Sequence, residues 1–217
     1  MGYAQLKLIA EHICANAASQ SPSLTTRVLR IGQIIGDTQN GIWNATEAIP
    51  LMIQSAVTVG ALPKLDEWMR WLPVDVVSNA IIDILHLSSP LSLPSTTNPP
   101  TEEIPNKVEV YNITNPHSFH WTTDLLPTLR TAGLQFTVLE PPEWISRVRD
   151  VPDPKANPPV KLVSFWEGKY AGSKPFKGLE FVTERTRARA SGLEGVEGLD
   201  TGLVGKMVEW FRGVAWV

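Results

Sequence analysis

Two features of the amino-acid sequence predict an α/β fold built around a parallel sheet. Residues 2–18 have helical character, and a polar link containing Ser and Pro at residues 19–23 ends this helix. An apolar run over residues 27–36 follows, with the pattern of a buried strand that ends in a glycine-punctuated loop. A helix, a short link and an apolar strand in this order are typical of a parallel α/β sheet.

The composition is that of an ordinary globular chain and argues against several classes of protein. The 217 residues are 43% hydrophobic and 19% charged, enough for one good core or two small ones. A formal net charge of −3 gives no sign of a nucleic-acid partner. No apolar run has membrane-spanning length, and Lys7, Glu11 and His12 interrupt the amino-terminal stretch, so we expect no membrane partner and no signal peptide. Cys14 is the only cysteine, which fits a reducing, cytoplasmic location.

Further helical and strand-like segments follow along the chain. Plain core packing is one of two equally weighted interpretations of the apolar segment Ile49–Val59, the other being a part in substrate binding. Asp75 stands where it can cap a helix whose apolar residues form two adjacent stripes, namely Val76, Ala80 and Ile84, and Val77, Ile81 and Leu85. The other expected elements are strands over 108–114 and 135–139, helices over 121–132, from 141, over 161–170 and over 203–216, and loops over 88–107 and 150–159.

Tyr3 and Lys7 are the candidate catalytic residues. Residues four apart share one face of a helix, so the phenol and the ammonium can point at the same spot. A neighbouring cation favours the phenolate and lowers the tyrosine pKa. A phenol tuned in this way can exchange a proton with a carbonyl or alcohol oxygen during hydride transfer. The same spacing also occurs in ordinary amphipathic helices, so the motif needs support from the rest of the chain.

That support comes from four motifs that occur in order. They are Gly2-Tyr3-x-x-x-Lys7-x-x-x-Glu11, the run Arg27–Gly36, Gly41-Ile42-Trp43-Asn44 and Trp71-Leu72-Pro73-Val74-Asp75. Together they resemble the carboxyl-terminal half of a thioester reductase domain, which belongs to the extended short-chain dehydrogenase/reductase group. Such domains end nonribosomal-peptide-synthetase-like enzymes and carboxylic acid or aminoadipate reductases, especially in fungi. The resemblance is strong to about Leu85 and looser from there to the end; Leu6 stands where the family often has serine, which we expect to alter packing only.

The resemblance implies a fold and a domain organisation. It makes the chain a single partial domain over residues 1–217, the carboxyl-terminal portion of an NAD(P)-binding Rossmann-like fold. Residues 1–36 are expected to end the Rossmann-like core, and residues 37–217 to form mainly a largely helical substrate-binding lobe. The amino-terminal dinucleotide-binding half, with its glycine-rich turn and the Ser or Thr that assists the tyrosine, is expected upstream of Met1. A half-sheet exposes an unpaired edge and apolar faces, so we also expect dimerisation, rearrangement or marginal stability.

The resemblance further implies a reaction with NADPH as the cofactor. Tyr3 and Lys7 are then catalytic, with Lys7 also holding the ribose hydroxyls of the cofactor. Gly32, Gln33 and Ile34 are expected to lie against the nicotinamide. The expected partners are a phosphopantetheinylated acyl carrier domain and its acyl thioester, which is released as an aldehyde. A separate amino-terminal half or a second copy of the chain is a further expected partner.

Two other functions remain open from the sequence. In the first, the chain is a non-catalytic fragment that binds substrate or docks a carrier domain. In the second, it is another extended reductase relative, such as a nucleotide-sugar epimerase, with the same Tyr and Lys pair. The dipeptides Gly32-Gln33 and Trp43-Asn44 favour the thioester group. Binding of a carrier domain rather than a nucleotide sugar would distinguish these alternatives.

Three weaker patterns favour structural interpretations. The segment Gly192–Gly198 has a Gly-x-x-Gly-x-x-Gly spacing, but no strand pattern precedes it and its two glutamates would repel phosphate, so a loop is expected. His117 and His120 lie three apart without Cys or carboxylate partners at ligand spacing, which argues against a metal. A basic run is formed by Arg185, Arg187 and Arg189. It is compatible with a solvated helix face, or with docking of an acidic carrier domain or of its phosphopantetheine phosphate.

Overall fold

The computed structural model describes residues 2–21, 23–86, 108–170 and 181–216. The loop predicted over residues 88–107 lies outside these ranges. The helices are α1 (Gly2–Gln20), α2 (Ala48–Thr58), α3 (Val74–His86), α4 (Leu126–Thr131), α5 (Pro141–Arg149), α6 (Val163–Tyr170), α7 (Glu184–Arg187) and α8 (Thr201–Trp210). The strands are β1 (Thr26–Ile31), β2 (Gln33–Ile35), β3 (Ala61–Pro63), β4 (Trp68–Met69), β5 (Trp71–Pro73), β6 (Val108–Ile113), β7 (Phe119–His120) and β8 (Thr137–Leu139). Short 3-10 or π turns cover Trp121–Leu125, Pro158–Leu162, Ser191–Leu193 and Phe211–Ala215.

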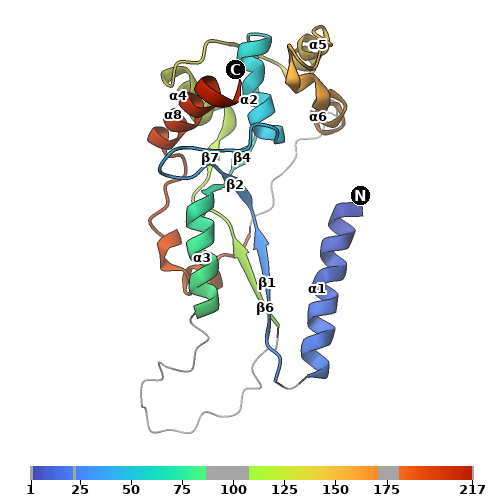
Figure 1. Cartoon of the computed structure of the whole chain (residues 1–217), viewed down its shortest axis with the longest axis vertical. Helices are drawn as coiled ribbons and strands as arrows, with labels where there is room; N and C mark the ends of the chain where they lie inside the picture. The colour runs from blue at the N-terminus through green and yellow to red at the C-terminus, as the bar shows by residue number, and fades with distance from the viewer. Residues whose placement is uncertain (1, 22, 87–107, 171–180, 217) are drawn as a thin grey trace.

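Parallel strand pairing confirms the predicted α/β class. β1 pairs with β6 over six residues, from Thr26 opposite Val108 to Ile31 opposite Ile113. β2 pairs with β5 and β3 with β8 in the same parallel sense, while β4 and β7 are antiparallel. Figure 1 shows β1 and β6 side by side, with α1 on one side of them and α3 on the other. Among the described strands β6 is the only neighbour of β1, so the second edge of β1 has no described partner.

The single buried strand predicted over residues 27–36 is wrong in two respects. The run divides into β1 and β2 at Gly32, because the chain changes its partner strand from β6 to β5 there. Gly32 still donates its backbone N–H to the carbonyl of Ile113 at 2.9 Å, so the two strands remain linked. β1 is also only half-buried, and Arg30 and Ile31 at its carboxyl end are exposed.

A small core joins α3 to the β1–β6 pair. Its buried members are Leu72, Val77, Ala80, Ile84, Tyr111, Ile113, Ala190 and Leu193. The predicted stripes on α3 are therefore shifted: Val77, Ala80 and Ile84 face the core, and Leu85 is exposed. Asp75 lies inside the first turn of α3, and its carboxylate accepts hydrogen bonds from the backbone N–H and the hydroxyl of Thr38, which anchors the loop after β2.

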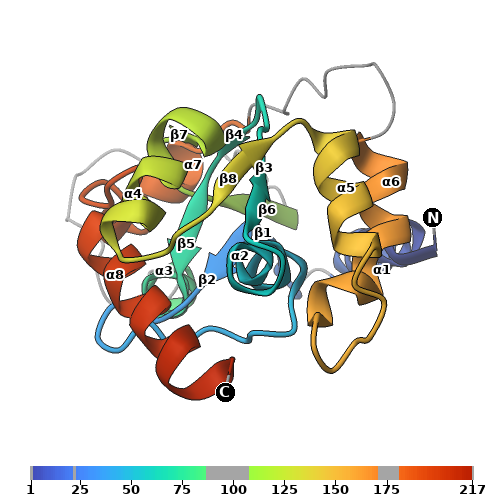
Figure 2. The same cartoon turned by 90° about the horizontal axis from the view of Figure 1, so that it is seen from above.

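The larger core lies among α2, α4, α5, α6 and α8, and Figure 2 shows α2 between the α5–α6 pair and the α4–α8 pair. The helix α2 is almost wholly buried from Pro50 to Ala56, so the segment 49–59 has the core-packing role. Trp121, Trp144 and Trp166 are each 0% exposed and fill this core. None of the described helices has the length and the apolarity needed to cross a bilayer.

The carboxyl-terminal helix packs against the loop that follows β2. Gly41 adopts a φ of 68°, and a Cβ atom there would meet the backbone nitrogen of Met207 at 2.6 Å, so only glycine allows this approach. Lys206 Nζ donates to the carbonyl of Thr38 at 2.7 Å. The Asp37 carboxylate accepts backbone N–H groups from Asn40, Ile42 and Gln39, and these bonds hold its pKa below the ordinary value. This loop therefore joins β2 firmly to α8.

Candidate active site

The structure brings Tyr3 and Lys7 together on α1. Lys7 Nζ lies 5.2 Å from the centroid of the Tyr3 ring, within the range of a cation–π contact. Their spacing of four residues places both side chains on one helix face, as the sequence predicts. Tyr3 is 75% exposed, so its hydroxyl is open to a ligand.

This helix face forms one wall of a groove of about 640 Å³, and β1 with the start of β2 forms the other. Tyr3, Lys7, Gly32 and Ile34 all line the groove, so four of the five predicted site residues share one concave surface. Gln33 does not line it. The Gln33 amide instead donates to the carbonyl of Ile34 at 2.7 Å and reaches the Glu47 carboxylate at 3.5 Å.

Gly32 allows the close approach of two segments at the end of the groove. A Cβ atom at this position would lie 3.0 Å from Thr114 Oγ1 and 3.3 Å from Thr114 Cβ. Thr114 is buried directly after β6, so it has little space in which to move. A side chain at position 32 would therefore separate β1 from the end of β6 and change the shape of the groove wall.

An ion pair fixes α1 against β1. Arg30 Nε and Nη2 donate to the two carboxylate oxygens of Glu11 at 2.9 and 2.6 Å, a bidentate geometry. The hydrogen bond from Arg30 lowers the pKa of Glu11, and the same bond raises the pKa of Arg30. Both residues line the groove. Because only Ala18 is buried on α1, this pair is a principal restraint on where Tyr3 and Lys7 stand.

Glu11 and Arg30 are functional candidates that the sequence alone did not indicate. A signal was present, since Glu11 continues the spacing of Tyr3 and Lys7 by four more residues and so lies on the same helix face. Arg30 belongs to the strand that packs against that face, but its pairing with Glu11 depends on the register of the helix against the strand. Two further contacts support the same wall: Arg27 Nε to Glu109 Oε2 at 3.0 Å and Thr26 Oγ1 to the carbonyl of Cys14 at 3.3 Å.

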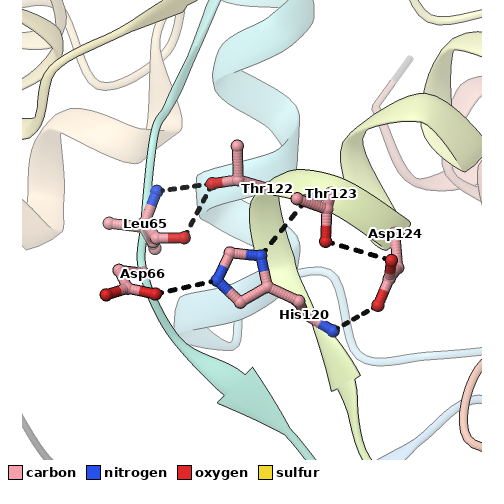
Figure 3. A network of polar contacts seen from close by, with 6 residues as sticks. All are labelled: Leu65, Asp66, His120, Thr122, Thr123 and Asp124. Carbon is pink, nitrogen blue, oxygen red and sulfur yellow. Dashed lines mark hydrogen bonds and ion pairs between the residues drawn. The ribbon is translucent and has the colours of Figure 1, made fainter.

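The two histidines have different surroundings and form no metal centre with each other. Figure 3 shows the ring of His120 between Asp66 and Thr123: Nε2 lies 3.1 Å from Asp66 Oδ1, and Nδ1 accepts the backbone N–H of Thr123 at 3.2 Å. Nε2 therefore carries the hydrogen that is donated to Asp66. His117 is exposed, and no group of three or more possible ligand side chains among the described residues is placed to hold a metal ion.

The glycine-rich and basic segments also lie outside the groove. The segment 192–198 begins in a three-residue 3-10 turn and continues as a loop toward α8, as predicted, and α7 rather than a strand precedes it. The helix α7 ends at Arg187, so Arg189 lies beyond it and the shared helical face expected for Arg185 and Arg189 does not form. Arg185 is exposed, which agrees with a solvated surface.

The groove residues fit the nicotinamide-ribose end of a dinucleotide. The Tyr3 hydroxyl and the Lys7 ammonium supply donors for ribose hydroxyls from one wall. The exposed carboxyl end of β1 and Gly32 supply an opposite wall with little side-chain bulk. Within the described ranges no glycine-rich turn joins a strand to a helix amino terminus at this groove, so the residues present account for one end of the cofactor and not for its pyrophosphate.

Comparisons with known proteins show which fold and which family model the chain resembles. The NAD-binding family model described as "Male sterility protein" matches residues 1–81. The solved terminal R domain from the myxalamid PKS-NRPS pathway has the same fold, with a TM-score of 0.75 and 20% identity, over 100% of this chain and 50% of that one. The fold is therefore the Rossmann-like α/β fold of the extended short-chain dehydrogenases/reductases.

Two sequence relatives show more specifically which proteins the chain resembles. The chain is 32% identical over 217 residues to a non-reducing polyketide synthase of Emericella nidulans, and 28% identical over 224 residues to a 3-methylorcinaldehyde synthase of Talaromyces stipitatus. The alignments cover 95% and 100% of this chain but only 8% of each relative. The chain therefore resembles a thioester reductase (R) domain, and it aligns with 50% of the solved myxalamid R domain. A nicotinamide nucleotide is the cofactor class of this family.

Proposed function

We propose that the chain takes part in the NADPH-dependent reduction of a carrier-bound acyl thioester to an aldehyde. The observation that carries this proposal is the Tyr3–Lys7 pair, which stands on the wall of a groove whose opposite side is the exposed end of β1 and Gly32. The Talaromyces relative is by name an aldehyde synthase, which supports an aldehyde as the product.

The roles of the groove residues follow from their chemistry. Lys7, with Gly32 and Ile34 on the opposite wall, would hold the nicotinamide-ribose end of the cofactor, which would supply the hydride for the carbonyl carbon of the thioester. The Tyr3 hydroxyl donates its proton to the carbonyl oxygen as negative charge develops there, and the Lys7 ammonium stabilises the phenolate that Tyr3 becomes. Breakage of the carbon–sulfur bond of the resulting hemithioacetal then releases an aldehyde and a free thiol. Glu11 and Arg30 act at a distance from this chemistry, by holding α1 against β1.

The partner in this proposal is an acyl carrier domain that bears the thioester on its phosphopantetheine arm. Its support is that the solved R domain with the same fold is terminal in a PKS-NRPS pathway. The groove is open enough for a long arm, since Tyr3 is 75% exposed at one end of it. Preference for NADPH over NADH belongs to the proposal and rests on the family resemblance.

The test combines cofactor binding with a matched pair of tyrosine variants. NADPH is titrated into the 217-residue chain by calorimetry, and NADPH oxidation is then followed with an acyl-pantetheine thioester. Tyr3→Phe is expected to lower the rate by about 10²- to 10⁴-fold, the usual contribution of a general acid. Tyr170→Phe is the control, because Tyr170 also contacts a lysine, with Lys169 Nζ 2.8 Å from its hydroxyl, but does not line the groove. Equal rates for Tyr3→Phe and the unchanged chain would refute the catalytic role of Tyr3.

A second candidate function is a non-catalytic module that docks a carrier domain. It is favoured by one observation, the lack of a phosphate-binding glycine turn at the groove within the described ranges. A folded chain that binds a phosphopantetheinylated carrier domain but not NADPH would support this function over the first.

A further inference from the structure

The chain leaves β2 in a compact turn that spans residues 36–41. The backbone N–H of Gly41 donates to the carbonyl of Asp37 at 2.9 Å and closes the turn. The two ends of the turn also touch, because a Cβ atom on Gly36 would lie only 2.7 Å from the carbonyl carbon and oxygen of Gly41. A turn closed in this way has little internal freedom, so a displacement of the turn is passed on to Ile35, the last residue of β2.

Thr38 lies inside this turn, and two helices hold it. From α3, the Asp75 carboxylate accepts the backbone N–H of Thr38 at 3.2 Å and also accepts its hydroxyl. From α8, Lys206 Nζ donates to the carbonyl of Thr38 at 2.7 Å. The N–H, the hydroxyl and the carbonyl of Thr38 are therefore all used, and we name this set of contacts between Thr38, Asp75 and Lys206 the Thr38 clasp.

The clasp lies where it can fix the position of β2. This strand has only three residues, and its parallel pairing with β5 ends at Ile35 opposite Pro73. Asp75 follows Pro73 by two residues and Thr38 follows Ile35 by three, so their contact links the two segments beyond the last strand pair. Three residues are at the short end of strand lengths, so we expect the clasp to supply much of the restraint on β2.

The restraint reaches the groove through Ile34. Ile34 is the middle residue of β2 and lines the groove, and Gly32 lines it directly before the strand. Thr38 does not line the groove, so it acts there only through β2. Tyr3 and Lys7 stand on α1, which forms the other wall, and no residue of the clasp belongs to that helix. The clasp therefore bears on one wall of the groove and not on the pair that exchanges the proton.

We propose that Thr38 is a positioning residue, and that its clasp sets the position of the β2 wall of the groove. The consequence for NADPH rests on the proposed function, in which this wall receives the nicotinamide-ribose end of the cofactor. Loosening the clasp lowers the affinity, because part of the binding free energy is then used to bring β2 back into place. Proton transfer from Tyr3 is unaffected, so kcat is retained while KM for NADPH rises.

A set of variants of the full 217-residue chain tests this role. Thr38→Val keeps the shape of the side chain and lacks the hydroxyl that Asp75 accepts, whereas Thr38→Ser keeps a hydroxyl. Thr58→Val is the matched control, because the Thr58 hydroxyl also donates to one side-chain oxygen, Asn157 Oδ1, at 2.7 Å. Thr58 is the last residue of α2 and does not line the groove. Lys206→Met removes the other arm of the clasp at an exposed position, so the test does not depend on Thr38→Val alone.

Calorimetric titration with NADPH is the first measurement. Thr38→Val is expected to bind NADPH about three- to tenfold more weakly than the unchanged chain, since only part of the free energy of one hydrogen bond reaches the groove. Lys206→Met is expected to change the affinity in the same direction, and Thr38→Ser and Thr58→Val to leave it within about twofold. In the thioester assay, Thr38→Val is expected to raise KM for NADPH by a similar factor without changing kcat. An equal loss of affinity in Thr58→Val and Thr38→Val would show a general effect of lower stability and would overturn the proposal.

The position of β2 is also measured without a ligand. The amide ¹H–¹⁵N signals of Gly32 and Ile34 are expected to shift in Thr38→Val and to stay in place in Thr58→Val. If the chain binds NADPH, an unchanged affinity of Thr38→Val overturns the positioning role and leaves the proposed function intact. If the unchanged chain does not bind NADPH, the proposed function fails, and the amide signals then decide the positioning role: a shift in Thr38→Val alone supports it, and unshifted signals overturn it.

Discussion

Ser55→Ala is expected to destabilise the larger core far more than its size suggests. Ser55 is 0% exposed in α2, and its hydroxyl lies 2.6 Å from the carbonyl of Met52 and 2.8 Å from that of Ala61. The same oxygen accepts the indole N–H of Trp144 at 2.9 Å. One hydroxyl thus joins α2, the start of β3 and the main tryptophan of α5.

The magnitude follows from what the substitution leaves behind. Trp144 is also 0% exposed, so its N–H would remain buried without a partner in the variant. A buried unsatisfied group costs about 1–3 kcal/mol, and the better helix propensity of alanine returns only a few tenths of this. We expect the free energy of unfolding to fall by about 2 kcal/mol, and the midpoint temperature by about 4–8 °C for a chain of this size. Urea unfolding followed by tryptophan fluorescence measures the free energy, and a thermal scan followed by far-UV circular dichroism measures the midpoint temperature.

Ser78→Ala is the matched control for this prediction. Ser78 is an exposed helical serine whose hydroxyl donates to the carbonyl of Val74 at 2.8 Å, so it has the local backbone bond of Ser55 without the buried partner. We expect its effect to stay within about 0.5 kcal/mol, as for most surface substitutions. Equal losses in Ser55→Ala and Ser78→Ala would show that the Trp144 bond does not carry the stability assigned to it.

Three further predictions concern the groove. Glu11→Gln should lower the free energy of unfolding by about 0.2–1 kcal/mol at pH 7, typical of a surface pair, and should have no effect in acid. Because Arg30 lowers the folded-state pKa of Glu11, the pair stabilises the fold at neutral pH, and this contribution is lost as pH falls through that pKa. Unfolding curves at pH 3 and pH 7 test this prediction. Gly32→Ala should cost about 1–3 kcal/mol by overpacking, measured by urea unfolding, and Thr114→Ala should recover part of it; additive losses would contradict the contact. The chain should self-associate through α1, and Ile9→Lys, at a 53%-exposed position, should weaken this in sedimentation equilibrium; a monomer at all concentrations with sharp cooperative unfolding would count against it.

Local sequence signals predicted much of the fold. The helix at residues 2–20, the strands at 108–113 and 137–139 and the helix that begins with Pro141 all follow from periodicity and from Pro and Gly punctuation. The helix expected over 121–132 begins as a π turn before α4, and Gly133 with a φ of 95° ends it. Periodicity does not determine which strand a segment pairs with. For that reason the sequence did not predict the division of the run 27–36 at Gly32.

The candidate site shows the same limit. The spacing of Tyr3 and Lys7 is a property of one helix, so the sequence contained it. Glu11 with Arg30 is a contact between a helix and a strand 19 residues apart, and no local pattern determines its register. Gln33 was grouped with Gly32 and Ile34, but only Gly32 and Ile34 line the groove.

The short strand β2 borders two different hollows of the molecule. In β2, Ile34 lines the groove beside Tyr3 and Lys7, and Ile35 lines a second cavity of about 400 Å³ beside Trp71. Both positions are fixed by one parallel pairing, in which Ile34 lies opposite Leu72 and Ile35 opposite Pro73. A shift of β2 by one residue would exchange the two faces, so a single short strand sets the geometry of both sites. Because the loop after β2 is itself held by α8, the carboxyl-terminal helix contributes to the shape of the groove without touching it.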